Sequence, residues 1–421
     1  MKDFGAILAE RRDDPSFNTS YPLSPGDWAA YRVDGGLPFG DSRRMSFYVH
    51  VPFCRRLCSF CEYTRTLCPE DTVQNAYVDG LASDVASFIR SHPGIVLDGF
   101  DIGGGTPTSL CPSAFAGLMD VYRMAVGECS LADGFEPSIE GTIETATADK
   151  LRMIAETGIG RISVGVQSTD RRVLEMGNRA GESADALAAF VRTAHSAGIG
   201  KVNIDLMYGL RGQTADSVRE DLGRILAVRP EQVTLYELRG NMTGASVPDH
   251  GTLTEFYGIM FSGLTTAGYH GEYGRNTFSL DPDDFGLSSY LRGRMFGFVP
   301  YKGFGISAQS MSPSGISYNM GKGRADIRPL LAAGSYPEEY TYVLPPNEML
   351  AKYVSVSGYA GRFSGTVADR ILGEEFAMKY ADELEYCILA GLMEKRGEWY
   401  CLTHEGFKYY GAVLSLFGKK C

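Results

Sequence analysis

Residues 48–61 read Tyr48-Val-His-Val-Pro-Phe-Cys-Arg-Arg-Leu-Cys-Ser-Phe-Cys61, an apolar strand-like run that leads into three closely spaced cysteines. The spacing places the thiolates of Cys54, Cys58 and Cys61 on one short loop. Thiolates are preferred ligands of soft metals and of iron–sulfur clusters. The stretch therefore predicts a cubane cluster, in which three protein ligands leave one of the four irons free to bind a small molecule.

A structural zinc loop is the competing interpretation of the same cysteines. Such loops normally present four ligands as two close pairs, and no second pair with that spacing follows. Cys68 lies seven residues beyond Cys61, and His50 lies inside the expected strand, where its side chain need not face the loop. The pattern favours a cluster over zinc.

The composition is that of an ordinary globular protein. The chain has 421 residues, of which 44% are hydrophobic, and this is enough for a large core in two or three structural units. A formal charge of −11 without a basic stripe argues against nucleic acid as a partner. No apolar stretch reaches membrane-spanning length, and the N-terminus lacks the apolar run of a signal peptide. We therefore expect a cytoplasmic protein with reduced cysteines and no membrane partner.

From residue 46 onward, β-rich runs alternate with helical patterns, which is typical of βα units that build a parallel sheet. The expected strands are Phe47–Val51, Gly99–Gly103, Ser138–Gly141, Arg161–Val166, Lys201–Met207 and Gln232–Glu237. The expected helices are Asn75–Ser91, Pro112–Val126, Ala148–Glu156, Ala184–Ala197 and Ala215–Val228. Six units are too few for a closed (β/α)8 barrel. The sequence predicts an α/β fold with a partial (β/α)6 barrel, whose active residues lie at the C-terminal strand ends.

Three parts are expected along the chain. Residues 1–45 form an N-terminal extension that wraps the barrel or covers its mouth, residues 46–320 form the barrel and further loops, and residues 321–421 form a C-terminal domain. After about residue 240 the pattern loosens into loops rich in Gly and Tyr, and a helical, partly β module is expected from about residue 345.

Several expected strand ends carry residues suited to a polar ligand. Asp101-Ile-Gly-Gly-Gly-Thr-Pro-Thr follows the second strand, and its glycines allow the backbone to approach a ligand, although a simple tight turn explains them equally. Glu140 ends the third strand, where it can accept hydrogen bonds from hydroxyl or ammonium groups or remain a solvated loop acid. Asp205 is flanked by apolar residues, and a buried acid requires partners.

The spacing Cys-x3-Cys-x2-Cys, with Phe60 directly before the third cysteine, resembles the radical S-adenosylmethionine (SAM) superfamily. The phrase from Tyr48 to Cys54 narrows the resemblance to the oxygen-independent coproporphyrinogen III oxidase-like, or HemN-like, family. The resemblance implies a [4Fe-4S] cluster that binds SAM at its open iron and, once reduced, cleaves it to a 5′-deoxyadenosyl radical. It also implies a HemN-like C-terminal domain and an electron donor such as flavodoxin or ferredoxin. The SAM contacts that it implies are Tyr48, Phe60, Gly103, Gly104, Gly105, Thr106, Glu140, Gln167, Arg179 and Asp205.

A second SAM is the other feature that the resemblance implies. The matching phrase is Tyr301-Lys-Gly-Phe-Gly-Ile-Ser-Ala-Gln-Ser, and the residues carried over are Gly303, Gly305, Ile306 and Ser307. A glycine-rich connecting loop is the alternative interpretation of this phrase.

The sequence departs from the decarboxylating oxidases directly after the third cysteine. Those enzymes usually have a further cysteine there, whereas this chain has Tyr63. The departure favours the class C methyltransferase and cyclopropanase branch, in which a methyl or methylene group of the second SAM adds to an unsaturated carbon of a small molecule. Tyr236 and Glu237, at the end of the sixth strand, are candidate acid/base or substrate-positioning residues, with ordinary strand-end packing as the alternative. Porphyrin oxidation or remodelling and heme-chaperone activity remain the alternative functions.

Overall fold

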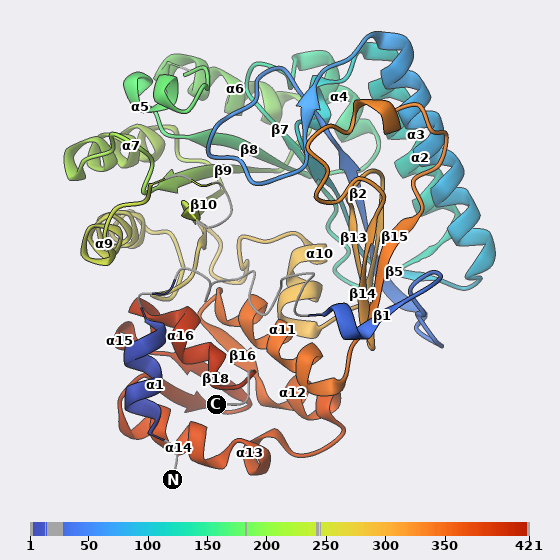
Figure 1. Cartoon of the computed structure of the whole chain (residues 1–421). Helices are drawn as coiled ribbons and strands as arrows, with labels where there is room; N and C mark the ends of the chain where they lie inside the picture. Colours follow the sequence, from blue (N-terminus) through green and yellow to red (C-terminus); the bar gives the residue numbers. More distant parts are fainter. Residues whose placement is uncertain are drawn as a thin grey trace.

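The large sheet is organised around the six expected parallel strands. The computed structural model describes residues 3–12, 14, 28–181, 183–240, 244 and 246–418. Within them, parallel neighbours follow one another in chain order. These strands are β2 (Arg44–Val51), β5 (Val96–Gly104), β7 (Ser138–Gly141), β8 (Arg161–Gln167), β9 (Lys201–Tyr208) and β10 (Gln232–Glu237). The prediction of a partial parallel barrel is confirmed, because the sheet curves but does not close (Figure 1).

Helices connect these strands on the outer side of the sheet (Figure 1). They are α2 (Asp71–Ser91), α3 (Pro112–Glu128), α4 (Ala148–Glu156), α5 (Arg171–Met176), α6 (Ala184–Ala197) and α7 (Ala215–Val228). Three of them, α4, α6 and α7, have the expected bounds, and a hydroxyl at each N-cap explains where they begin. Thr147, Ser183 and Thr214 accept hydrogen bonds from backbone N–H groups in the first turn.

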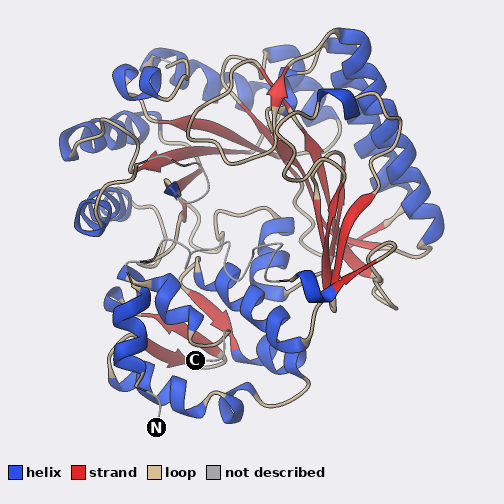
Figure 2. Cartoon of the chain, in the orientation of Figure 1, coloured by secondary structure: helices blue, strands red, loops and turns tan. Residues whose placement is uncertain are grey.

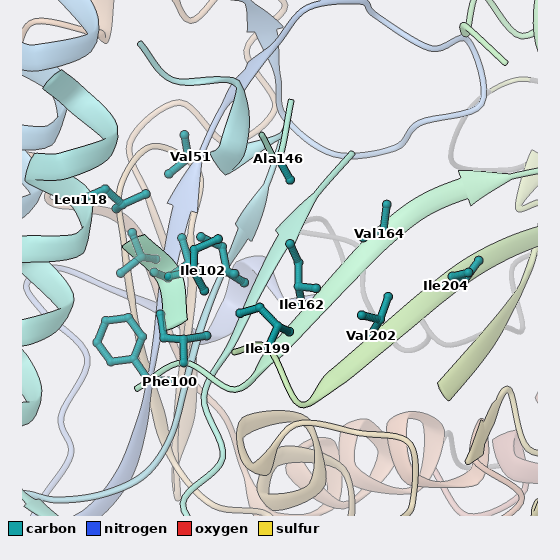
Figure 3. Packing of buried hydrophobic residues seen from close by; sticks show 14 of the residues in the cluster. Val51, Phe100, Ile102, Leu118, Ala146, Ile162, Val164, Ile199, Val202 and Ile204 are labelled. Carbon is teal, nitrogen blue, oxygen red and sulfur yellow. The ribbon is translucent and has the colours of Figure 1, made fainter. Parts of the chain in front are cut away.

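Alternation along the strands separates an apolar outer face from a polar inner face. In β5, Phe100 and Ile102 are buried on the helix side, where Leu118 of α3 reaches toward the sheet (Figure 3). Ile162, Val164, Val202 and Ile204 continue this layer on β8 and β9 (Figure 3). The intervening residues of the same strands point into the concavity, and they include most of the candidate site.

Further strands extend the sheet on both sides. An antiparallel β11 (Thr277–Ser279) joins β10. On the other side, β12 (Tyr301–Phe304) runs parallel to β2. Beyond it follow the antiparallel strands β13 (Gln309–Ser312), β14 (Gly315–Asn319), β15 (Glu338–Val343) and β1 (Arg32–Val33). Short strands β3 (Phe53–Cys54) and β4 (Thr66–Leu67) frame the cysteine loop, and β6 (Ser130–Leu131) pairs with β5.

The expectation of loops after residue 240 is wrong for most of that stretch. Helix α9 (His250–Thr266) follows, and then the strands named above, with α10 (Ser289–Arg292) and a π-helical turn (Gly293–Gly297) between them. The α9 sequence contains glycines that weaken intrinsic helix propensity. One of them has a packing reason, because a Cβ at Gly263 would lie 2.2 Å from the Leu222 side chain of α7. Tertiary packing therefore determines this helix more than its local sequence.

A second, smaller sheet lies apart from the first and is covered by helices (Figure 2). Its order is β16 (Arg362–Ser364), β18 (Trp399–Leu402) and β17 (Met393–Arg396), all antiparallel. The helices of this module are α11 (Pro346–Gly358), α12 (Gly365–Leu372), α13 (Phe376–Lys379), α14 (Ala381–Leu389), α15 (His404–Lys408) and α16 (Tyr410–Ser415). The expected mixture of helices and strands from about residue 345 is therefore confirmed.

The described part of the N-terminal extension reaches both sheets. Helix α1 (Phe4–Arg11) packs on the C-terminal module, where the rings of Phe4 and Tyr386 lie 5.4 Å apart and Arg11 donates a hydrogen bond to Ser415 Oγ at 2.8 Å. Strand β1 then pairs with β15. The domain boundaries at residues 45 and 320 stay a prediction. Strand β15 belongs to the large sheet although it lies C-terminal to residue 320. None of the described helices is long and apolar enough to cross a bilayer.

Candidate functional site

The three cysteines lie on a loop that leaves the end of β2 and is fixed by backbone hydrogen bonds. Cys54 lies in β3, whose pairing with β4 closes the loop. Cys61 N–H donates to Cys58 O at 3.3 Å, and Cys68 N–H donates to Cys54 O at 3.0 Å. The guanidinium of Arg65 donates to Cys58 O at 2.5 Å, which ties the loop to itself. Cys54 and Cys58 are both buried.

The surroundings of the thiols combine burial with donors and positive charge. The pKa of Cys54 is raised to about 11, chiefly by burial and then by the charges of Cys61 and Cys58, although a hydrogen bond from Thr106 Oγ1 at 3.6 Å and the charge of Arg65 lower it. The pKa of Cys61 is raised by burial and lowered by Arg65. Three thiolates that repel one another in a buried loop require a positive centre. The donor set therefore fits a thiolate-bound metal group.

The described residues contain no group of three His, Cys, Asp or Glu side chains arranged around one metal ion. An iron–sulfur cluster takes its cysteine thiolates on different irons, so its ligands lie further apart than those of a single ion.

An open pocket, whose empty space of about 570 Å³ includes adjoining solvent, lies beside the cysteine loop. Its lining includes Cys58, Thr106, Gly165 and Arg179, which come from four different parts of the sequence. Arg179 donates to Cys58 Sγ at 3.7 Å and also to Gly165 O. The structure thus brings together the cysteine loop, the glycine loop and the predicted arginine.

The glycine loop at the end of β5 packs tightly against its neighbours. A Cβ at Gly103 would lie 2.7 Å from the Glu140 carboxylate, and one at Gly105 would lie 2.8 Å from the backbone of Phe53. Gly104 has a φ of +112°, and its N–H donates to Glu140 Oε2 at 3.1 Å. The glycines therefore allow β5 to approach both the cysteine loop and Glu140.

Three carboxyl groups on the inner face interact electrostatically with one buried arginine. Burial raises the pKa of Asp101 and of Glu140 to about 7 and that of Asp205 to about 6, and the charge of Asp205 also raises the pKa of Glu140. Arg161, which lowers all three pKa values, is 3% exposed and donates to Ser138 Oγ at 2.7 Å. The sequence analysis overlooked Arg161, because a cation at the start of a strand carries no motif.

Gln167 ends β8 in a left-handed conformation with a φ of 70°. Its Oε1 is buried and has no hydrogen-bond partner among the described residues. A Cβ at Gly165 would lie 2.7 Å from Gln167 Nε2. The side-chain amide of Gln167 therefore lies beside Gly165, which lines the pocket, and its oxygen accepts no hydrogen bond from the described residues.

The aromatic candidates have separate surroundings. Tyr48 stacks on Tyr290, with ring centroids 5.7 Å apart, and its pKa is raised first by burial and then by Glu140. Phe60 packs on Gly177, where a Cβ would lie 2.8 Å from its ring. Tyr63 is 54% exposed, yet burial by surrounding protein atoms and the charge of Glu140 raise its pKa. Tyr63 therefore lies among many protein atoms while its side chain still reaches solvent.

The second glycine phrase lies in β12 and the turn into β13. A Cβ at Gly303 would lie 2.2 Å from Gln309 O, so the glycine is required by the hairpin. Gly305 has a φ of +94°, and Ile306 N–H donates to Tyr77 OH at 3.0 Å. Ser307 has a φ of 60°, and its Oγ is buried without a partner among the described residues. Packing explains Gly303, Gly305 and Ile306, whereas the Ser307 hydroxyl lacks a hydrogen-bond partner among the described residues.

Tyr236 and Glu237 point to opposite faces of β10. Thr234 donates to Asn203 Oδ1 at 3.0 Å on the inner face, so Tyr236, two residues on, shares that face. The pKa of Tyr236 is raised by burial, then by Asp205. Glu237 instead lines a separate pocket of about 340 Å³ beside α9, where Tyr208 OH donates to it at 3.3 Å. Burial raises the pKa of Glu237 to about 7. The structure therefore separates the two candidates.

Comparison with known proteins gives one family model and a set of relatives that match between about half and most of this chain. The model of the radical SAM superfamily matches residues 48–225. The chain is 30% identical over 327 residues to an oxygen-independent coproporphyrinogen III oxidase of Bradyrhizobium diazoefficiens, with 72% of this chain and 71% of the relative covered. It is 25% identical over 387 residues to the heme chaperone HemW of Bacillus subtilis, with 88% of this chain and 98% of the relative covered.

Among solved structures, the chain resembles the coproporphyrinogen III oxidase HemN of Escherichia coli. The TM-score is 0.77 at 23% sequence identity, with 95% of this chain and 96% of that chain covered. This likeness extends over both sheets and confirms the predicted fold class.

Proposed function

The chain belongs to the radical SAM superfamily and to its HemN-like family, and we propose on this basis that it transfers a methyl or methylene group from a second SAM to an unsaturated carbon of a small molecule. Proteins of this superfamily use a [4Fe-4S] cluster and SAM. When bound, these groups supply the one-electron chemistry that abstracts a hydrogen atom. An electron donor such as flavodoxin or ferredoxin completes the proposal.

The residues proposed to hold the cluster are Cys54, Cys58 and Cys61. Thr106 and Arg179 lie on two sides of this loop and donate toward Cys54 and Cys58, so they stabilise negative charge on sulfur. A guanidinium in a pocket beside the cysteines is also suited to bind the carboxylate of SAM. We assign this role to Arg179.

The remaining proposed SAM contacts lie on the same inner surface. Glu140 and Asp205 offer carboxylates to an ammonium group or to ribose hydroxyls, and the unused acceptor of Gln167 is available to a donor. The other members of this set are Tyr48, Phe60, Gly103, Gly104, Gly105 and Thr106. For a second SAM, the set is Gly303, Gly305, Ile306 and Ser307, and the unsatisfied Ser307 hydroxyl is the observation that supports it.

Addition to an unsaturated carbon must be followed by loss of a proton. A base works best when its pKa lies near the working pH. Glu140, with a pKa of about 7, meets this condition, and Tyr236 lies on the same face of the sheet. Glu237 faces the other pocket, so we retain Tyr236 as the positioning residue and assign Glu237 no contact with the reacting carbon.

Tyr63 is the observation that favours group transfer over decarboxylation. It replaces the cysteine that usually follows the third cluster ligand in the decarboxylating enzymes. Its half-exposed side chain interacts electrostatically with Glu140, Cys61 and Asp205, so it borders the space in which a substrate would react.

Product analysis tests the proposal. Anaerobically reconstituted protein is incubated with methyl-labelled SAM, a reductant and a panel of unsaturated heteroaromatic acids. Transfer yields 5′-deoxyadenosine together with S-adenosylhomocysteine or methylthioadenosine and a labelled acceptor. Release of carbon dioxide from coproporphyrinogen III without label transfer would refute it.

Heme binding is the second candidate, favoured by the similarity to HemW over most of both chains. Stoichiometric binding of hemin, without consumption of SAM in the presence of any acceptor, would support this function instead.

A further inference from the structure

A second pocket lies where the large sheet and α9 meet the C-terminal module. Glu237 at the end of β10 and His250 at the start of α9 line it from one side, and residues of α15 and α16 line it from the other. In Figure 1, α9 lies on the side of the large sheet nearest to these two helices. The rings of Tyr257 in α9 and Phe407 in α15 lie 5.3 Å apart, so the two parts of the fold are in contact here.

Aromatic rings form much of the wall of this pocket. They belong to Tyr208, Tyr257, Tyr273, Phe407 and Tyr410. Tyr257 OH accepts a hydrogen bond from Gly274 N–H at 2.8 Å and donates one to Arg275 O at 2.7 Å, so its ring is the part left for a ligand. The faces of such rings attract cations.

The carboxyl group of Glu237 is the acidic group of the pocket. Tyr208 OH donates to its Oε2 at 3.3 Å, and no described residue forms an ion pair with it. Burial raises the pKa of Glu237 to about 7, so above this pH the group is largely ionised. A carboxylate that is withdrawn from water without a cation is costly.

The cations near Glu237 are held by other acids. Lys408 also lines the pocket, but its side chain is partly exposed and donates to Glu405 at 2.6 Å. Arg239, two residues beyond Glu237, pairs with Glu62. The position opposite the Glu237 carboxylate is therefore suited to a cation from outside the chain.

His250 contributes a second polar group to the wall. Its Nε2 is buried and has no hydrogen-bond partner among the described residues. In the tautomer that carries the proton on Nδ1, Nε2 is an acceptor. A ligand that satisfies both His250 and Glu237 must therefore donate hydrogen bonds and carry positive charge, and an ammonium group does both.

We infer that this pocket binds the ammonium group of an aliphatic amine, which donates to the Glu237 carboxylate and to His250 Nε2 while its alkyl chain lies against the aromatic rings. The inference is independent of the proposed group transfer, because the pocket beside the cysteine loop shares no lining residue with this one. A free amine and a lysine side chain carry the same group, so the test includes a probe for each source.

The test uses the full-length protein at pH 8 in phosphate buffer, which contains no competing amine. Calorimetry measures the affinities for pentylammonium and for the uncharged pentan-1-ol, which has nearly the same shape. Because a charge-assisted hydrogen bond is lost, pentan-1-ol should bind roughly 10- to 100-fold more weakly than pentylammonium. Nα-acetyllysine amide is the third probe. If it binds more tightly than pentylammonium, the source is a lysine side chain, and the reverse order identifies a free amine; either order supports the ammonium site.

Glu237→Gln removes the charge but keeps the size of the side chain and an acceptor for Tyr208. It should bind pentylammonium roughly 10- to 100-fold more weakly and pentan-1-ol as the wild type does. Glu255→Gln is the matched control, because it removes an exposed carboxylate of α9 and should leave both affinities unchanged. Saturating pentylammonium should raise the unfolding temperature of the wild type and of Glu255→Gln, but not that of Glu237→Gln.

Pentan-1-ol that binds as tightly as pentylammonium would overturn the inference. So would a wild type in which pentylammonium produces neither binding heat nor a rise in unfolding temperature. Equal losses of affinity in Glu237→Gln and Glu255→Gln would assign the effect to overall surface charge and would also overturn it. The comparison of the two probes on the wild type needs no variant, so it decides the inference even if Glu237→Gln does not fold.

Discussion

Glu140 makes the stability of the protein depend on pH in a direction that follows from its raised pKa. Its pKa rises from 4.5 to about 7 in the folded protein, chiefly through burial and then through the charge of Asp205. Between these two values the folded state keeps a proton that the unfolded state has lost, so the free energy of unfolding falls as pH rises. A shift of this size is worth about 3 kcal/mol at ~1.36 kcal/mol for each pH unit, but the Glu140 side chain is exposed to solvent in β7, so screening reduces the expected loss to about 1 kcal/mol.

Glu140→Gln removes this titration while it keeps the size of the side chain. We expect the difference in unfolding free energy between variant and wild type to grow by about 1 kcal/mol in favour of the variant from pH 4.5 to pH 8. Urea unfolding of the protein without added SAM, repeated at half-unit steps of pH, measures this difference. Glu128→Gln, at the exposed end of α3, is the control. A Glu140→Gln difference that is the same at every pH would refute the raised pKa assigned to Glu140.

Three further changes test other parts of the site. Arg179→Ala should weaken SAM binding about 10- to 100-fold in equilibrium dialysis, because a charged hydrogen-bond partner is lost, and an unchanged affinity would contradict the assigned contact. Gly105→Ala should cost about 1–3 kcal/mol in urea unfolding, since its Cβ would lie 2.8 Å from backbone, whereas Gly127→Ala in open space should not destabilise; equal effects would contradict the packing argument. Tyr236→Phe should lower the rate of label transfer more than Glu237→Gln does, because only Tyr236 faces the acids, and the reverse order would contradict the proposed roles.

The barrel could be predicted from sequence because its units repeat one local pattern. Apolar runs of strand length alternate with helices whose N-caps are Thr147, Ser183 and Thr214. A hydroxyl residue before a helical pattern can be recognised in the sequence. Helix α9 also has an N-cap, Asp249, but its glycines lower the helix propensity of the stretch, and the packing of Gly263 against Leu222 of α7 is not visible in the sequence. Strands β12 to β15 were missed for a similar reason, because short strands of glycine, serine and tyrosine resemble loops.

Part of the candidate site could be predicted from sequence motifs, and part of it could not. Motif residues such as Arg179 and Thr106 proved to lie beside the cysteine loop. Tyr236 and Glu237 are adjacent in sequence, but strand alternation sends them to different pockets. Arg161 has no motif, and its importance follows from its burial and from its effect on carboxyl groups that come from three other strands. Such a network depends on tertiary packing, which a single sequence does not display.

The central claim is that Cys54, Cys58 and Cys61 hold a cluster with one iron open to SAM. Electron paramagnetic resonance of the anaerobically reduced protein, recorded with and without SAM, tests it most directly. We expect a [4Fe-4S] signal that changes when SAM is added and that is absent from Cys58→Ala. Protein without iron and labile sulfide, or a signal that SAM leaves unchanged, would contradict the claim.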